Sequence, residues 1–171
     1  MSIFSKWFGT QERQENTMVA FATGTMCRLS ETPDKAFSSL AIGDGVAITP
    51  GQPSVVAPAD GTITMIFPTK HAFGIVTEEG IELLVHIGID TVNLKGKGFK
   101  YFKKVNEKVR AGEKIVDVDI DAIKKNGCDP IIMMIVANQN GYSFTYKANG
   151  VVKKGKSVVA EYEKNMTETE N

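Results

Sequence analysis

The chain contains two histidines, His71 and His86, which could meet across one hairpin. The segment from Ile81 to Ile89 predicts a strand whose odd-numbered residues are buried on one face. His86 would then lie on the opposite face, where the neighbouring Gly88 leaves space for a ligand to approach. The preceding run, from His71 to Val76, predicts a second strand with His71, Phe73 and Ile75 on a common face.

The turn between these strands decides whether the histidines meet. A two-residue turn at Glu78–Glu79 sets His71 directly opposite His86, and a turn at Glu79–Gly80 makes them diagonal neighbours on one face. A three-residue turn, 78–80, separates them unless a bulge restores the phase. Opposed residues have Cβ atoms about 4.5–5.5 Å apart, so we expect the two imidazoles to share one ligand.

Two neutral imidazoles on one face could serve a metal site, acid–base catalysis or nucleophilic capture of a phosphoryl group. They could also be purely structural. Zinc would want a third protein ligand, and the carboxylate near His86 in sequence is Asp90. Acid–base catalysis needs a nucleophile or a paired carboxylate, which the region does not clearly supply. Phosphoryl capture needs only a neutral ring nitrogen, a neighbouring donor and apolar surroundings, and the ordinary histidine pKa of about 6.5 favours it.

The elements that must position these rings are short and β-rich. Gly, Pro and Asp divide the chain from about Met18 to Tyr162 into runs typical of a sandwich or barrel. We therefore predict an all-β, antiparallel β-sandwich or barrel-like single domain with short helical segments. The expected helix spans 119–127, with an acidic start and a terminal Gly. The expected strands are Gly45–Ile48, Gly61–Phe67, Phe73–Val76, Ile81–Ile89, Lys114–Val118 and Ile131–Val136.

Composition narrows the class of protein. The 171 residues fit one domain, and 20 basic residues balance 20 acidic ones, so no overall field favours nucleic acid. Cys27 and Cys128 lack CxxC spacing, and no export signal or membrane span is evident, so we expect a cytoplasmic protein with reduced thiols.

We predict three parts: a flexible segment 1–17, a domain 18–162 and a polar tail 163–171. Phe4, Trp7 and Phe8 would line one side of a short helix. This side could contact lipid weakly, or it could dock on the domain itself.

The segment from Gly80 to Val92, GIELLVHIGIDTV, resembles the phosphorylation-site signature of the glucose-type enzyme IIA family at every diagnostic position. This family belongs to the bacterial sugar phosphotransferase system. The resemblance extends over nearly all of 18–162, through the stretches 33–37, 43–48, 56–61, 67–73 and 94–99.

The resemblance implies an antiparallel sandwich with a shallow apolar depression that holds two histidines. His86 would accept phosphate on Nε2 (the tele position) from the phosphocarrier HPr and pass it to a Cys of a permease IIB domain. His71 would stabilise and help donate the phosphoryl group, with Thr69 in its hydrogen-bond network. The protein would thus be a phosphotransferase component that acts as a relay through a phosphohistidine.

The resemblance also implies a partner-binding rim around the depression. An apolar patch around a reactive histidine is typical of a surface that a partner covers transiently. Two positions depart from the family: Ile87 stands where relatives often have Phe, and Lys70 adds a cation beside His71. The predicted rim comprises Phe37, Phe67, Phe73, Ile87, Asp34, Asp90 and Lys70.

Further expectations concern ligands and partners. We expect a monomer that needs no cofactor and that binds regulatory proteins in addition to HPr and the IIB or IICB partner. In such a complex, His71 and His86 could join a partner carboxylate around zinc.

Two other classes of protein remain as alternatives. Stretches 56–63 and 105–116 also resemble lipoyl and biotinyl carrier domains, although no Met-Lys-Met triplet is present. A zinc endopeptidase on a related scaffold would want a His-x-His pair, which the sequence around His86 lacks.

Overall fold

The structure is a computed structural model that describes residues 14–167, so the predictions for Phe4, Trp7 and Phe8 lie outside the described residues. The regular structure of the described part consists mainly of short antiparallel strands with few helical turns, which confirms the predicted fold class. No helix in this part of the chain is both long and apolar enough to cross a bilayer.

Eight strands form the main sheet, in the order β13-β2-β3-β11-β7-β6-β5-β9, and every printed pairing is antiparallel. Their bounds are β2 Gly24–Arg28, β3 Asp44–Pro50, β5 Gly61–Ile66, β6 Ala72–Thr77, β7 Glu82–Ile89, β9 Lys108–Val109, β11 Asp129–Asn138 and β13 Gly150–Val152.

Two small sheets complete the β structure. One has the order β1-β14-β12 (Thr17–Val19, Val158–Lys164 and Tyr142–Tyr146), and the other β4-β10-β8 (Ser54–Val56, Lys114–Val118 and Phe99–Tyr101). The helical pieces are short: η1 Leu29–Glu31, α2 Lys35–Ser38, η2 Thr91–Leu94 and α3 Ile120–Lys125.

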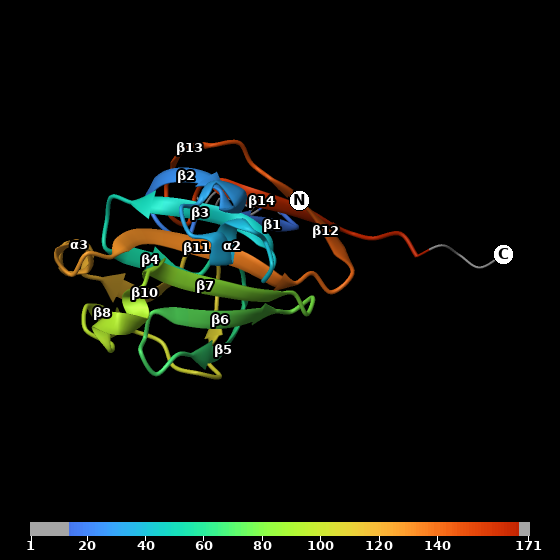
Figure 1. The fold of residues 1–171 in the computed structure, drawn as a ribbon. Helices are drawn as coiled ribbons and strands as arrows, with labels where there is room; N and C mark the ends of the chain where they lie inside the picture. Colours follow the sequence, from blue (N-terminus) through green and yellow to red (C-terminus); the bar gives the residue numbers. More distant parts are fainter. Residues whose placement is uncertain (1–13, 168–171) are drawn as a thin grey trace, which may run out of the picture.

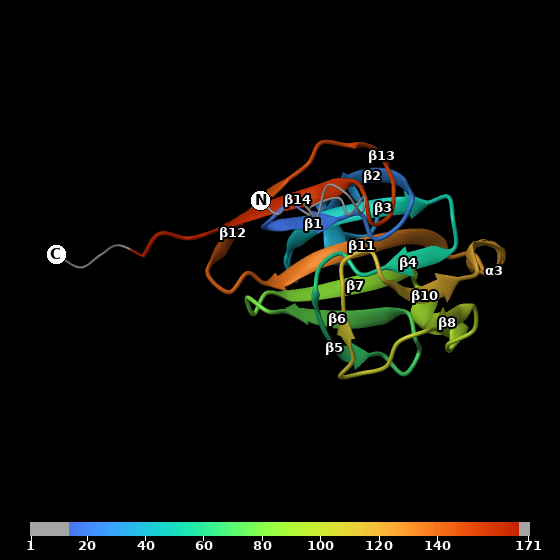
Figure 2. The same cartoon turned by 180° about the vertical axis from the view of Figure 1, so that it is seen from behind.

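Apolar side chains form two clusters, one on each face of the main sheet. The inner core joins one face to strands of the two small sheets, for example Val116 of β10 and Ala160 of β14. An outer cluster covers part of the other face, beneath η1 and α2. Figure 1 shows α2 in front of the main sheet, and Figure 2 shows β1 and β14 from behind. The outer cluster comprises Leu29, Phe37, Ala47, Ile89, Ile131, Met133 and Ile135.

Of the three turns considered for the β6–β7 hairpin, the structure has the three-residue one, so His71 and His86 are not the opposed or diagonal pair that the two-residue turns predict. The ladder pairs Ala72 with His86 and Phe73 with Val85, and a three-residue loop, 78–80, closes it. His71 therefore precedes the strand instead of pairing within it. Its predicted face was also wrong, because Phe73 and Ile75 belong to the inner core, whereas the His71 ring lies beside His86.

The face assignment of β7 is confirmed for its first part. Ile81, Leu83, Val85 and Ile87 lie in the inner core, and His86 points to the other side. Ile89 instead joins the outer cluster. The alternation changes because Gly88 adopts a left-handed conformation (φ 78°) and the β7–β11 ladder shifts register at this end.

The predicted helix is present as α3. The Asp119 side chain caps it by accepting a hydrogen bond from the Ala122 N–H at 3.0 Å, and Gly127 follows it with φ 76°. The N-cap and the left-handed glycine thus account for both ends of a helix too short to persist alone.

Candidate functional site

His86 is held on β7 by its own backbone. Its Nδ1 lies 2.9 Å from the carbonyl oxygen of Gly88. A carbonyl can only accept, so Nδ1 carries the proton. In the neutral ring, Nε2 is then the nitrogen with the free lone pair.

His71 is held by Thr69. The Thr69 hydroxyl lies 2.7 Å from Nδ1 of His71. The His71 residue is only 7% exposed. This contact occupies Nδ1 and leaves Nε2 of His71 as the ring nitrogen available to a ligand. Both histidines therefore present the same nitrogen.

The two rings lie side by side in an aromatic setting. Their centroids are 4.9 Å apart and their planes meet at 74°. Phe37 of α2 packs on His86 with a centroid distance of 4.7 Å, and Phe67 packs on His71 at 5.3 Å. The predicted meeting of the two imidazoles is confirmed, although by a bend before β6 and not by the expected ladder.

Burial keeps both rings neutral. It lowers the pKa of His86 from 6.5 to about 4, with a smaller contribution from the nearby His71; the Gly88 carbonyl and Asp34 act in the opposite direction. Burial also lowers the pKa of His71. At pH 7, His86 is therefore an uncharged base whose nucleophilic lone pair is not blocked by a proton.

The structure corrects part of the predicted rim. Phe73 and Ile87 are each 0% exposed and pack in the inner core, so neither can contact a partner. The cause for Ile87 is strand alternation, since it lies on the face opposite to His86. Phe37 (9% exposed) and the half-buried Phe67 do lie at the site, each against one histidine.

The charged residues of the predicted rim lie on short turns, and Asp34 is near enough to His86 to act on its pKa. Asp34 caps α2 by accepting a hydrogen bond from the Ala36 N–H at 2.8 Å, and this cap helps to fix Phe37 over His86. Asp90 is exposed and left-handed (φ 63°) immediately after β7. Lys70 is exposed beside His71, also with a left-handed backbone (φ 62°).

Metal ligands are too few for a closed site within the described residues. Among residues 14–167, no group of three or more His, Cys, Asp or Glu side chains is arranged to hold a metal ion. His71 and His86 together supply two nitrogens, whereas a structural zinc site takes four protein ligands.

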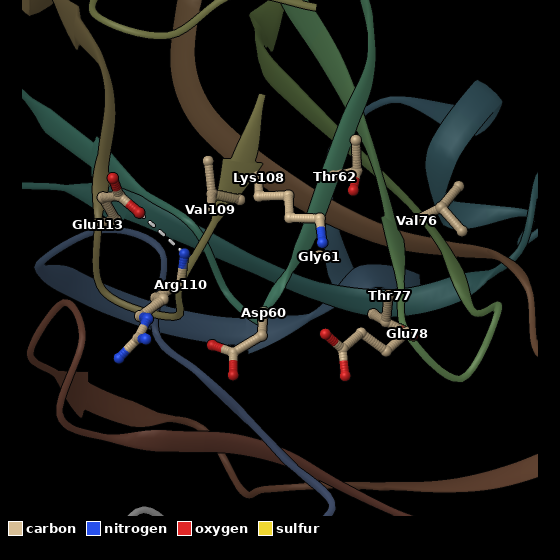
Figure 3. A pocket seen from close by; sticks show the side chains of 10 residues that line it. All are labelled: Asp60, Gly61, Thr62, Val76, Thr77, Glu78, Lys108, Val109, Arg110 and Glu113. Carbon is tan, nitrogen blue, oxygen red and sulfur yellow. Dashed lines mark hydrogen bonds between the residues drawn. The ribbon is translucent and has the colours of Figure 1, made fainter. Parts of the chain in front are cut away.

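A wide groove of about 1040 Å³ lies elsewhere, and it contains neither histidine. Figure 3 shows its polar lining, including Asp60, Glu78, Lys108 and Arg110. Thr77, the last residue of β6, also lines it, whereas His71 precedes the first residue of that strand. Six strand residues span roughly 20 Å, so the groove is separate from the histidine site.

Sequence reasoning missed two contributors. The carbonyl of Gly88 selects the His86 tautomer, although the sequence suggested only that this glycine gave room. A glycine inside a predicted strand often marks a bulge, so Gly88 could have indicated the register shift at this end of β7. The second is Tyr101 on β8, whose hydroxyl donates a hydrogen bond to the Lys70 carbonyl at 2.8 Å. Tyr101 is 31 positions from Lys70, so no local sequence pattern indicates this contact.

Comparisons with known proteins agree on one family. The family model described as phosphoenolpyruvate-dependent sugar phosphotransferase system, EIIA 1, matches residues 16–142. A solved structure, the glucose permease IIA from Mycoplasma capricolum, superposes with a TM-score of 0.78 at 40% identity, covering 84% of this chain and 93% of that one.

Two curated relatives differ in length. The PTS system glucose-specific EIIA component of Buchnera aphidicola (subsp. Acyrthosiphon pisum) is 36% identical over 159 residues, which are 93% of this chain and 97% of that protein. The PTS system glucose-specific EIICBA component of Staphylococcus carnosus is 44% identical over 136 residues, which are 80% of this chain but 20% of that protein. This chain thus spans nearly all of one relative and about a fifth of the other.

Proposed function

Since this chain belongs to the EIIA 1 family of the phosphoenolpyruvate-dependent sugar phosphotransferase system, we propose that it is a phosphocarrier that holds a phosphoryl group on Nε2 of His86. It would accept the group from phospho-HPr and donate it to a IIB domain during sugar uptake. The observation that carries the assignment is the hydrogen bond from His86 Nδ1 to the Gly88 carbonyl, because it leaves Nε2 unprotonated beside the second ring.

In the first step, the Nε2 lone pair of His86 attacks phosphorus, and the bond between phosphorus and the HPr atom that carried it breaks, with its electron pair returning to HPr. Nδ1 stays protonated throughout and donates its hydrogen bond to the Gly88 carbonyl. This hydrogen bond stabilises the positive charge that develops on the ring. In the second step, the Nε2–phosphorus bond breaks as the thiolate of the IIB Cys forms its own bond to phosphorus.

His71 would stabilise the transferring group from the side. If Thr69 donates its hydroxyl proton to Nδ1 of His71, then Nε2 of His71 carries a proton and can donate to a phosphoryl oxygen. The centroid separation of 4.9 Å allows both Nε2 atoms to reach one phosphoryl group. In that arrangement Thr69 selects the tautomer that this role needs.

The rim would serve recognition. Phe37 and Phe67 border the rings with apolar surface, and a partner that covers it would exclude the water that hydrolyses phosphohistidine. Asp34 places a carboxylate near His86, and the exposed Asp90 follows the strand that carries it. Carboxylates there would suit a partner with positive charges around its own active residue. Contacts of modest area allow the rapid release that a relay requires.

Zinc, location and oligomeric state complete the proposal. A metal at His71 and His86 would need further ligands from a partner protein, so it would act as an intermolecular bridge and not as a cofactor of transfer. We propose that the protein works in the cytoplasm as a monomer, since each of its two exchanges needs the same histidine surface to be free.

The test compares phosphoryl acceptance and donation by the wild type, His86→Ala and His71→Ala. Incubation with labelled phosphoenolpyruvate, enzyme I and HPr should label the wild type, and His86→Ala should take up no label. His71→Ala should be labelled but should fail to pass the label to a purified IIB domain. Normal labelling of His86→Ala would refute the assignment, and circular dichroism of each variant controls for folding.

A further inference from the structure

His71 sits at the end of a tight turn with an unfavourable backbone. The Lys70 N–H donates to the Phe67 carbonyl at 2.8 Å, and the Phe67 N–H donates to the Ala72 carbonyl at 3.0 Å. Lys70 takes a left-handed conformation (φ 62°), which is unfavourable for a residue with a Cβ. The turn therefore needs contacts from outside to stay in this form.

Two outside contacts hold the peptide groups on either side of His71. The carbonyl of Lys70, in the peptide group before His71, accepts the Tyr101 hydroxyl at 2.8 Å. The carbonyl of His71, in the peptide group after it, accepts the Ile87 N–H at 2.7 Å. Fixing both peptide planes fixes the direction in which the His71 side chain leaves the backbone.

Tyr101 is itself well anchored for this purpose. Its ring meets the buried Phe73 edge to face, with centroids 6.2 Å apart. Burial raises the pKa of its hydroxyl, so the group stays protonated and able to donate at any working pH. The loop that leads into β8 also lies close to the turn, because the position of a Cβ on Gly96 is 3.6 Å from Cδ of Lys70.

We propose that Tyr101 is a positioning residue for phosphoryl transfer, which acts through the Lys70 carbonyl to orient the His71 imidazole toward His86. The inference rests on the proposed role of His71. Tyr101 touches neither ring, so it would alter the orientation of His71 and leave the nucleophile, His86, unchanged.

Tyr101→Phe tests this because it removes one hydroxyl and keeps the ring that packs on Phe73. Tyr146→Phe is the matched control, since the Tyr146 hydroxyl is buried without a hydrogen-bond partner and lies on β12 of another sheet. The first readout is transfer of label from each phosphorylated protein to a IIB domain. The second is imidazole ¹⁵N NMR of the unphosphorylated proteins, which reports the tautomer and pKa of His71.

We expect Tyr101→Phe to accept phosphate at the wild-type rate but to donate it about five-fold more slowly, the factor that corresponds to one hydrogen bond of about 1 kcal/mol. We also expect the His71 tautomer signals to become mixed and its pKa to rise toward 6.5. Tyr146→Phe should match the wild type in both readouts.

Wild-type donation with unchanged His71 spectra in Tyr101→Phe would overturn the inference. A loss of acceptance equal to the loss of donation would also overturn it, because it would show a general effect on the fold. If the wild type itself takes no phosphate, the proposed function fails, yet the His71 spectra still show whether Tyr101 orients the ring.

Discussion

Acid should destabilise this protein partly through His86. Its pKa is about 4 in the folded chain, against an ordinary value of 6.5 expected for the unfolded chain. Between these values the unfolded state binds more protons, so the free energy of unfolding falls as the pH drops. The stability is fully present above pH 6.5 and is lost as the pH approaches 4.

The size of the effect follows from the shift. A difference of about 2.5 pKa units corresponds to at most about 3 kcal/mol, of which about 2 kcal/mol is lost by pH 5. His86 is only partly buried, so the measured loss should not exceed these values. This is a large share of the 5–15 kcal/mol that typically holds a domain together.

The contribution of His86 to this loss can be measured by urea unfolding of the wild type and of His86→Asn, each at pH 7 and at pH 5. The Asn amide can still donate to the Gly88 carbonyl but does not titrate, and carboxylate effects cancel in the comparison. The wild type should lose about 2 kcal/mol more than the variant between the two pH values. Equal losses, or an NMR titration that places the His86 pKa at 6 or above, would refute the reasoning.

Three further predictions concern the surroundings of the rings. Thr69→Val removes the hydroxyl on His71 and should slow donation to a IIB domain about five-fold while acceptance stays normal, as single-turnover labelling would measure. Gly88→Ala should cost at least about 2 kcal/mol in urea unfolding, because φ is 78° and the new Cβ would lie 2.3 Å from Cγ2 of Thr91; unchanged stability would contradict this. Phe37→Ala should lower stability by about 3 kcal/mol and raise the His86 pKa toward 6.5, so an NMR titration that stays near 4 would show that Phe37 does not shield the ring.

The fold class could be predicted from the sequence because its signals are local. Turn residues and alternating apolar residues mark most strands of the main sheet, and the strand predicted at Lys114–Val118 coincides with β10. The N-cap Asp119 and the terminal Gly127 marked α3 in the same way. Each of these features depends only on residues a few positions apart.

The hairpin register could not be predicted because it depends on a competition between turns. The structure has the three-residue loop 78–80, and with this loop the ladder begins at Ala72, so His71 lies just before it. The rings still meet, because the left-handed Lys70 and the hydroxyl of Tyr101, 31 positions further on, shape the approach to β6. The sequence thus predicted the correct pair of residues from an incorrect ladder.

Two of the rim predictions failed, for different reasons. Ile87 was predicted both as a buried strand residue and as a rim residue, and the structure supports only the first. For Phe73, the rim prediction agreed with the predicted strand face, and both were wrong because Phe73 faces the inner core while His71 precedes the strand. For Ile87, strand alternation predicted burial correctly, whereas the rim position carried over from the family motif was wrong.

The pairing of β1 with β14 has a practical consequence. Thr17 lies opposite Glu161 in that ladder, so the first and last strands of the described fold are neighbours. A short Gly/Ser peptide joining the two ends should therefore permit circular permutation, with new termini opened at an exposed loop such as 139–141, at the end of β11 away from the histidines. The same adjacency lets one module be appended to, or inserted between, other domains without disturbing its sheets.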